Sequence, residues 1–547
     1  MRVPVSVAAL FVLVLAGCAV IIAPSGGVKD ITPPGVVSSV PENYSANFNA
    51  TEIEIEFDEF IKLRDLFNNF IISPPLDAKP DIMIRGKSVI VKLDEPLDSN
   101  TTFNFSFGNA IVDIHEGNPI ADYHFVVSTG TFVDSLGIHG IATDALTLKP
   151  AEDVWVTMYE CPKYSGCDSL PSKDPPKYLT KTNKAGFFRI GNIQAGKYKV
   201  FALVDKNRNY LFDLPNESIG FIGNVIEAGD SAELRLSIFD QEDGNQKISK
   251  AWSPQRGLIK LAFKLPVGEV KIAALNFSSK KAWEVVDYTA NRDTVLYWNS
   301  SGIDSLELYV SDGRHSFEDT VVVGLGQKRE YSKLTVSTSC SKTRVLEIGQ
   351  SLKIYPSKPL VKYDEKRIQL FERGDSANYE QVNAKLSFAD AVNKVIEVNY
   401  DWKPGYTYRL HWDQGALTDF FQGVSDSASV NFSLRKEEYY GNAEIEVAFP
   451  KSEHPYIVQL VDAREKVSRE DIGMPGGTSQ DYRKKFDYKY LAPGKYKMKV
   501  IYDVNGNGRW DTGHHLENRQ PEKIVFSTEE IRIRSNWDLV LDWELEP

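Results

Sequence analysis

The chain has 547 residues, which is too long for a single hydrophobic core, so several domains are expected. An apolar fraction of 42% is enough to build buried cores. The chain carries 75 Asp and Glu residues against 63 Lys and Arg residues. This acidic balance argues against a nucleic-acid-binding protein, which would need a basic face.

Residues 1–17 have the features of a signal peptide: Arg2 precedes an apolar, small-residue run that is too short to span a bilayer. The run ends in LAGC, which resembles the bacterial lipobox, with Cys18 as its cysteine. This resemblance implies that cleavage exposes Cys18 and that acyl chains on it anchor the protein in a membrane. An ordinary secretory signal with a chance cysteine is the alternative. Because Ala19 is not an Asp, nothing resembles an inner-membrane retention signal, and we expect the outer membrane, with the periplasmic or extracellular face left open.

The segment 18–34 has no periodicity and is predicted to be a tether between the lipid and the first folded domain. Beyond it, apolar and polar residues alternate at period two. In the stretch 52–57, Ile53, Ile55 and Phe57 alternate with glutamates, which predicts a strand with one buried face and one wet face. Many such stretches, separated by Pro, Gly, Asn and Asp clusters, predict an all-β chain of tandem β-sandwich domains in an elongated arrangement.

Breaks in this pattern divide the rest of the chain into five units, which span residues 35–132, 134–238, 247–326, 335–434 and 438–547. Two sequence themes recur in order. The stretch 406–423 in the fourth unit occupies the place that 101–117 has in the first. The stretches 195–213 and 493–511 share the motif GKYK and the spacing D-x-N-x-N-x-x-x-D. Repetition of this kind indicates a modular scaffold built from similar units.

Several motifs carry a family resemblance: SGGVKDITPP, ISPPL, FSFGNAIVDIHEGNPI and YDVNGNGRWDTG, together with the lipobox. With these motifs the chain resembles the bacterial Ig-like lipoproteins widespread in Bacteroidota, whose first domain is similar to the SbsA-type Ig-like fold. The second unit resembles the carboxypeptidase regulatory-like domain, a small transthyretin-like sandwich. Its pattern is matched by Thr182, Gly186, Phe188, Ile190, Asn192, Ile193, Gly196 and Tyr198.

The resemblance implies an Ig-like fold for 35–132 and 335–434, and a carboxypeptidase regulatory-like fold for 134–238 and 438–547. The unit 247–326 lies outside it and is expected to be a β-rich middle domain. The resemblance also implies a membrane-tethered protein without catalytic activity.

The two D-x-N-x-N-x-x-x-D loops are candidate calcium sites. In the C-terminal copy the expected ligands are Asp503, Asn505, Asn507 and Asp511. In the other copy, which fits less well, they are Asp205, Asn207, Asn209 and Asp213. The carboxylate expected at the twelfth position is replaced by His514 and Asn216. Because Asp and Asn also favour tight turns, the same residues fit a hairpin tip that needs no ion. We therefore expect no required cofactor, with a weak structural calcium site as the open alternative.

Three further cysteines remain. Cys161 and Cys167 are close enough in sequence to form a disulfide in an oxidising compartment, whereas Cys340 has no partner. Their spacing does not fit a zinc site.

No catalytic motif accompanies these features: G-x-S-x-G, H-E-x-x-H and the phosphate-binding P-loop pattern are absent from the sequence. We therefore expect a non-enzymatic outer-membrane lipoprotein that acts as a modular scaffold or as an accessory subunit of an outer-membrane complex for assembly, secretion or uptake. One alternative is a surface adhesin or glycan-binding protein. The other is a hydrolase that uses paired carboxylates. A nucleic-acid partner is not expected.

Overall fold

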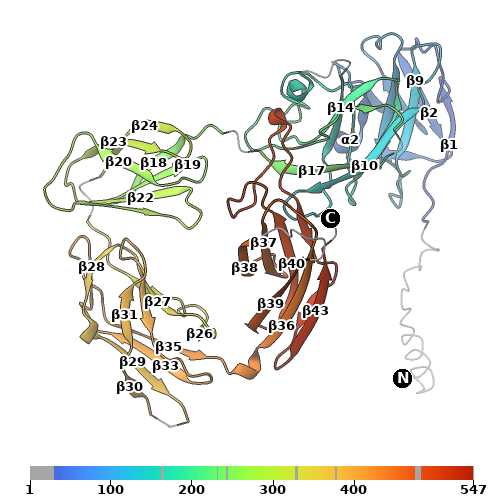
Figure 1. The fold of residues 1–547 in the computed structure, drawn as a ribbon. Helices are drawn as coiled ribbons and strands as arrows, with labels where there is room; N and C mark the ends of the chain where they lie inside the picture. The colour runs from blue at the N-terminus through green and yellow to red at the C-terminus, as the bar shows by residue number, and fades with distance from the viewer. Residues whose placement is uncertain are drawn as a thin grey trace, which may run out of the picture. The chain divides into compact units, whose positions relative to one another are not determined.

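A computed structural model describes residues 30–161, 166–230, 232–241, 244–326, 330–375, 378–474 and 482–545 (Figure 1). Cys18 and the predicted signal peptide lie outside these residues. The chain divides into two compact units, one formed by Met1–Asp240 with His515–Gln520 and the other by Gln241–His514 with Pro521–Pro547. Strands stacked in successive sheets dominate both units and confirm the predicted all-β chain of tandem sandwiches.

Within the residues that the structure describes, helical structure is confined to short segments. They are α2 (Leu66–Asn69) and the 3-10 turns η1 (Cys167–Ser172), η2 (Glu365–Arg367), η3 (Glu437–Tyr439) and η4 (His515–Glu517). In the part of the chain that the structure describes, no helix has the length and apolar character needed to cross a membrane.

The first sandwich contains β1–β9. One sheet has the order β1-β2-β6-β5 and consists of β1 (Val36–Val40), β2 (Glu52–Phe57), β6 (Ser88–Lys92) and β5 (Asp81–Arg85). The facing sheet has the order β4-β7-β9 and consists of β4 (Ile71–Ser73), β7 (Thr102–Gly108) and β9 (Tyr123–Ser128). A separate ladder pairs β3 (Ile61–Leu63) with β8 (Ile111–Asp113).

Alternation along the strands builds the core of this sandwich. Ile53, Ile55 and Phe57 are buried on one face of β2, as the sequence predicts, and Glu52 and Glu54 on the other face contact Arg85 of β5 at 3.3 and 2.9 Å. The apolar face of β2 packs against three phenylalanines of β7, which are Phe103, Phe105 and Phe107. Burial of these apolar side chains is the main stabilising contribution.

The second sandwich completes the first unit. Its strands follow the order β12-β11-β14-β15-β17-β10-β13, and β16 pairs with β14. They are β10 (Leu136–Asp144), β11 (Trp155–Glu160), β12 (Tyr178–Lys181), β13 (Phe187–Ile193), β14 (Lys197–Val204), β15 (Ser218–Phe221), β16 (Ile226–Glu227) and β17 (Leu234–Asp240).

The second unit begins with the third sandwich. One sheet has the order β18-β19-β22-β21 and the other β20-β23-β24. Their bounds are β18 (Ile248–Gln255), β19 (Leu258–Phe263), β20 (Val270–Ala274), β21 (Glu284–Tyr288), β22 (Thr294–Asn299), β23 (Ser305–Asp312) and β24 (Phe317–Gly324).

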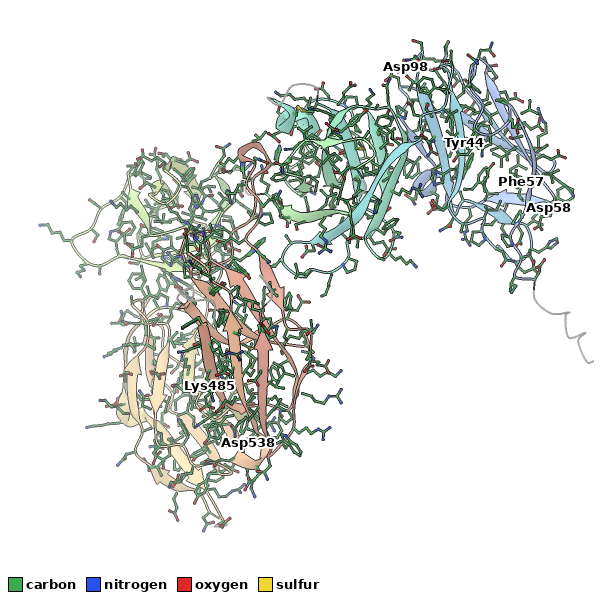
Figure 2. The ribbon with its side chains drawn as sticks, turned by 45° about the vertical axis from the view of Figure 1, so that its right-hand side comes forward. Tyr44, Phe57, Asp58, Asp98, Lys485 and Asp538 are labelled. Atoms are coloured by element: carbon green, nitrogen blue, oxygen red, sulfur yellow. A yellow bond between two sulfur atoms is a disulfide. The ribbon has the colours of Figure 1, made fainter. Side chains whose placement is uncertain are left out.

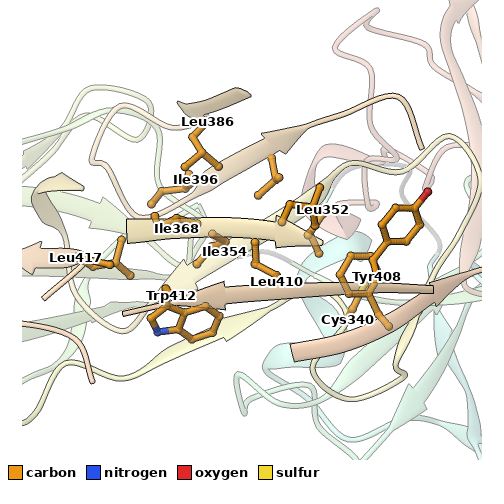
Figure 3. Packing of buried hydrophobic residues seen from close by; sticks show 14 of the residues in the cluster. Cys340, Leu352, Ile354, Ile368, Leu386, Ile396, Tyr408, Leu410, Trp412 and Leu417 are labelled. Atoms are coloured by element: carbon orange, nitrogen blue, oxygen red, sulfur yellow. The ribbon is translucent and has the colours of Figure 1, made fainter. Parts of the chain in front are cut away.

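The fourth sandwich has sheets of order β25-β27-β32-β31 and β26-β35-β33-β29-β30, with a separate β28-β34 ladder. Figure 3 shows its core, in which Leu352, Ile354, Tyr408 and Leu410 belong to one buried cluster. The strands are β25 (Val336–Thr338), β26 (Val345–Leu346), β27 (Leu352–Pro356), β28 (Leu360–Tyr363), β29 (Ile368–Arg373), β30 (Glu380–Val382), β31 (Lys385–Phe388), β32 (Ile396–Asn399), β33 (Thr407–Trp412), β34 (Leu417–Asp419) and β35 (Ala428–Leu434).

The fifth sandwich has one sheet of order β39-β36-β43 and another of order β38-β37-β40-β41, with β42 paired to β40. The strands are β36 (Gly441–Phe449), β37 (Tyr456–Asp462), β38 (Val467–Met474), β39 (Tyr482–Leu491), β40 (Gly494–Tyr502), β41 (Ile524–Phe526), β42 (Ile531–Ile533) and β43 (Asp538–Glu544).

The strand pairing of the second sandwich recurs in the fifth. In the second, β10 pairs antiparallel with β13 and parallel with β17, and in the fifth β36 pairs in the same two ways with β39 and β43. The central strand β14 pairs with β11, β15 and β16, and β40 pairs with β37, β41 and β42. The two loops that share the D-x-N-x-N-x-x-x-D spacing therefore follow equivalent strands, β14 and β40.

The first and fourth sandwiches are related in the same manner. The order β1-β2-β6-β5 in the first corresponds to β25-β27-β32-β31 in the fourth, and the ladder β3-β8 corresponds to β28-β34. The first pair of each ladder also agrees, because Ile61 faces Asp113 and Leu360 faces Asp419, although β28 has a register shift after Leu360 that β3 lacks.

Candidate functional site

The C-terminal loop is organised around a buried carboxylate. Asp503 follows β40 and is fully buried. Its Oδ1 accepts a hydrogen bond from the backbone N–H of Asn507 at 3.0 Å, and its Oδ2 accepts one from Gly508 at 2.8 Å. The side-chain amides of Asn505 and Asn507 both donate to Asp511 Oδ2 at 2.5 Å. The four predicted ligands are thus brought together in one loop.

A third acidic residue, after Asp503 and Asp511, completes this loop. Glu522 is buried, and its two oxygens accept hydrogen bonds from the backbone N–H groups of Val504 at 2.7 Å and Asp511 at 3.0 Å. Burial raises the pKa of Glu522, and the nearby carboxylates of Asp511 and Asp503 raise it further.

The first copy repeats the arrangement. Asp205 Oδ1 accepts from the backbone N–H of Arg208 at 2.5 Å, and Asp205 Oδ2 accepts from Tyr210 at 2.8 Å. The amides of Asn207 and Asn209 donate to the two oxygens of Asp213 at 3.0 and 2.8 Å. Here Glu217 is equivalent to Glu522 of the other copy. Its carboxylate accepts hydrogen bonds from the backbone N–H groups of Lys206, Asp213 and Leu214.

Sequence reasoning missed both glutamates. Glu217 lies four residues after Asp213, whereas Glu522 lies eleven residues after Asp511, so no common spacing marks them. The sequence does place an acidic residue after each loop. Only the repeated strand order shows that these two residues are equivalent.

In both loops the acidic oxygens serve as acceptors for backbone and amide N–H groups. Among the residues that the structure describes, no group of three or more His, Cys, Asp or Glu side chains is placed to hold a metal ion. The calcium sites at Asp503 and Asp205 therefore stay predictions, and the hydrogen bonds account for both loops as hairpin tips.

We expect a chelator to leave the fifth sandwich intact. Because internal hydrogen bonds hold the loop, adding EDTA to the full chain should not change the Tm, and millimolar calcium should not raise it. Differential scanning calorimetry measures both. A Tm that falls with EDTA and recovers with calcium would show instead that the loop needs the ion.

The cysteines occupy two different environments. Cys161 and Cys167 are joined by a disulfide with a Cα–Cα distance of 6.1 Å. Cys340 is a free cysteine in the core of the fourth sandwich (Figure 3), where burial raises the pKa of its thiol. A buried thiol of raised pKa is not a reactive nucleophile.

The two loops differ at the positions where the backbone turns left-handed. In the C-terminal copy these positions are Gly506 and Gly508, with φ of 68° and 76°. In the first copy they are Arg208 and Tyr210, each with φ of 63°. Glycine adopts this conformation freely, whereas other residues lose about 1–3 kcal/mol there. The first loop therefore keeps two strained side chains where its counterpart has none.

Both strained side chains line a cavity of about 450 Å³ in the first unit. The first sandwich supplies one wall from α2, β4 and the start of β5, including Phe67, Phe70 and Ile82. The second sandwich supplies the other wall, where Trp155 and Tyr210 meet edge to face with ring centroids 4.9 Å apart. The two sandwiches are also joined by a buried hydrogen bond, which the backbone N–H of Leu179 of β12 donates to Ser73 Oγ of β4 at 3.1 Å.

Cations surround the rings of this groove. The Arg208 guanidinium and the Lys79 ammonium lie 4.4 and 5.3 Å from the centroid of the Phe67 ring. Lys181 lies 4.6 Å from the Trp155 ring and forms an ion pair with Asp153 at 2.6 Å. Phe67 itself is 68% exposed, so one face of its ring is open to solvent beside these cations. The groove therefore combines apolar walls with an excess of positive charge.

Comparison with known proteins identifies one domain. A family model described as bacterial Ig-like domain matches residues 30–129 and confirms the Ig-like domain predicted for the first sandwich. A search of the curated proteins gave no match.

Among solved structures, the chain is similar to the surface-layer protein rSbsC(31-844), with 13% identity, coverage of 91% of this chain and 67% of that one, and a TM-score of 0.14. It is similar to BcpA, the major pilin subunit of Bacillus cereus, with 11% identity, coverage of 75% and 99%, and a TM-score of 0.13. It is also similar to the titin I-band fragment I67-I69, with 14% identity, coverage of 54% and 98%, and a TM-score of 0.12. These low scores carry no information about function.

Proposed function

We propose that this chain is a non-enzymatic lipoprotein of the outer membrane, anchored through Cys18, that serves as a modular scaffold or accessory subunit of an outer-membrane protein complex. In this proposal the fourth sandwich is a second Ig-like domain, and the second and fifth are carboxypeptidase regulatory-like domains. The anchor rests on the sequence LAGC, since Cys18 lies outside the described residues.

The observation that carries the proposal is the ordered duplication of two kinds of sandwich. Each copy keeps the strand pairing of its counterpart, and the acidic residues that the sequence singles out hold backbone N–H groups of the loops. Side chains engaged in this way shape a domain and leave little for acid–base chemistry. Repeated sandwiches present several surfaces and sheet edges to which a partner protein can bind.

Affinity purification from native membranes tests this function. The full chain with a C-terminal tag should recover a membrane protein in a fixed molar ratio after extraction in mild detergent. The Cys18→Ser variant should appear in the soluble fraction and recover less of that partner, because it lacks the anchor that concentrates it at the membrane. Recovery of the chain without a stoichiometric partner would contradict the proposal.

A further inference from the structure

We propose that the groove between the first and second sandwiches binds an anionic single-chain amphiphile. Its apolar tail lies between the walls, and its carboxylate or phosphate head contacts Arg208 and Lys79. This inference goes beyond the scaffold function and does not depend on the lipid anchor.

Backbone strain at Arg208 and Tyr210 supports a binding site here. Arg208 and Tyr210 adopt the left-handed conformation at positions where the equivalent loop has Gly506 and Gly508. The loop also closes with glycine, because Gly508 donates to Asp503 Oδ2 as Tyr210 donates to Asp205 Oδ2, both at 2.8 Å. The strain therefore is not needed to form the turn. Retained strain of this kind is typical of residues that are held in place for binding.

The volume and the lining of the groove fit a small ligand with an apolar chain. A volume of about 450 Å³ lies within the range of roughly 300–1,000 Å³ that small-molecule sites occupy, and such sites are common where two domains meet. Phe67 and Phe70 on one side and Trp155 and Tyr210 on the other give the groove two aromatic walls. An apolar chain between these walls removes water from both.

The positive charges of Arg208 and Lys79 fit an anionic head group. Arg208 stacks on Phe67, and a stacked guanidinium keeps its N–H donors directed outward in its own plane. Within the described ranges, neither Arg208 nor Lys79 has a carboxylate partner. Asp81 is the one acidic residue among those that line the groove. Two such cations beside one exposed ring form a binding site for an anionic head group joined to an apolar body.

Four amphiphiles with the same twelve-carbon tail test the proposal. The full chain carrying Cys18→Ser, which avoids detergent, is titrated by calorimetry with dodecanoate, dodecyl phosphate, dodecyltrimethylammonium and dodecyl maltoside, each below its micelle concentration. One or both anionic compounds should bind at least tenfold more tightly than the cationic and neutral ones. The stronger of the two anions identifies the head group.

Variants separate binding from stability. Arg208→Gly should weaken binding of the anionic amphiphile at least tenfold and leave the Tm unchanged or higher, because it removes the head-group contact and the backbone strain together. Phe67→Ser should also weaken binding. Phe60→Ser is the matched control, since Phe60 is a 56% exposed ring of the same sandwich with Lys87 at 5.7 Å and lies outside the groove.

The proposal is overturned if the four head groups bind equally, if no amphiphile binds, or if Arg208→Gly retains the affinity of the unmodified groove. An effect of Phe60→Ser equal to that of Phe67→Ser would also overturn it, because binding would then be to exposed rings in general. None of these results bears on the membrane partner, so this proposal and the scaffold function fail separately.

Discussion

Replacing Lys358 by Met should destabilise the fourth sandwich by about 3–5 kcal/mol, the cost of leaving a buried charge without its partner. The side chains of Lys358 and Asp419 are 2% and 0% exposed, and Lys358 Nζ lies 3.0 Å from Asp419 Oδ2. Asp419 Oδ1 accepts the backbone N–H groups of Phe421 and Gly423, so the carboxylate cannot turn away to water. Lys358 also donates to the carbonyl oxygen of Ser332.

Hydrogen exchange measured by mass spectrometry on the full chain checks this result. Amides of β27 and β33 should exchange far faster in Lys358→Met, because exchange from a core strand reports the stability of its own domain. Lys333→Met is the control: Lys333 pairs with Asp426 at 2.6 Å, but the two side chains are 67% and 59% exposed. An exposed pair contributes about 0–1 kcal/mol. Equal exchange in the two variants would show that the buried pair is not needed.

The first sandwich has an acidic residue at the position equivalent to Lys358. Ile61 faces Asp113 as Leu360 faces Asp419, so Glu59, two residues before Ile61, occupies the position of Lys358. Burial raises the pKa of Glu59, and the carboxylate of Asp113 raises it further. Asp113 instead relies on the backbone N–H groups of Glu116, Gly117 and Asn118. Backbone N–H groups thus hold the buried Asp in both copies, and the fourth sandwich adds the Lys358 ammonium.

Replacing Asp503 by Ala should destabilise the loop after β40 by about 3 kcal/mol or more, because a hydrogen bond to a charged group contributes about 1.5–3 kcal/mol and two are lost. The N–H groups of Asn507 and Gly508 then have no acceptor on Asp503. Asp503→Asn should cost less, since its amide oxygen keeps one acceptor.

Hydrogen exchange of residues 503–526 measures the loss. Asp538→Ala is the control in the same sandwich. Asp538 is exposed (Figure 2) and accepts a surface hydrogen bond from Asn442 Nδ2 at 2.7 Å, so its removal should change stability by no more than about 0.5 kcal/mol. If Asp503→Ala exchanges no faster than Asp538→Ala, the buried carboxylate does not hold the loop.

Strands were the part of the fold that the sequence predicted well. The alternation of Ile53, Ile55 and Phe57 with glutamates has a period that only a strand with two different faces satisfies, and β2 has this burial pattern. The residues of the two loops were also found from spacing, because they lie close together along the chain. Their role as acceptors for backbone N–H groups was not predicted, since spacing alone does not distinguish a hydrogen-bonded turn from an ion site.

The groove could not be predicted from the sequence. Phe67 and Lys79 lie far along the chain from Trp155, Lys181 and Arg208, and only the packing of two sandwiches brings them together. The sequence shows that Tyr210 replaces the glycine of the other loop, but it does not show the backbone conformation of Arg208 and Tyr210. Their left-handed backbone became informative only beside the two glycines of the equivalent loop.

Mass spectrometry of the mature N-terminus shows whether the scaffold is held at a membrane through Cys18. Protein isolated from native membranes should begin at Cys18 and carry a diacylglycerol group on its sulfur and an acyl chain on its amino group. An N-terminal peptide that begins elsewhere, or that begins at an unmodified Cys18, would contradict it.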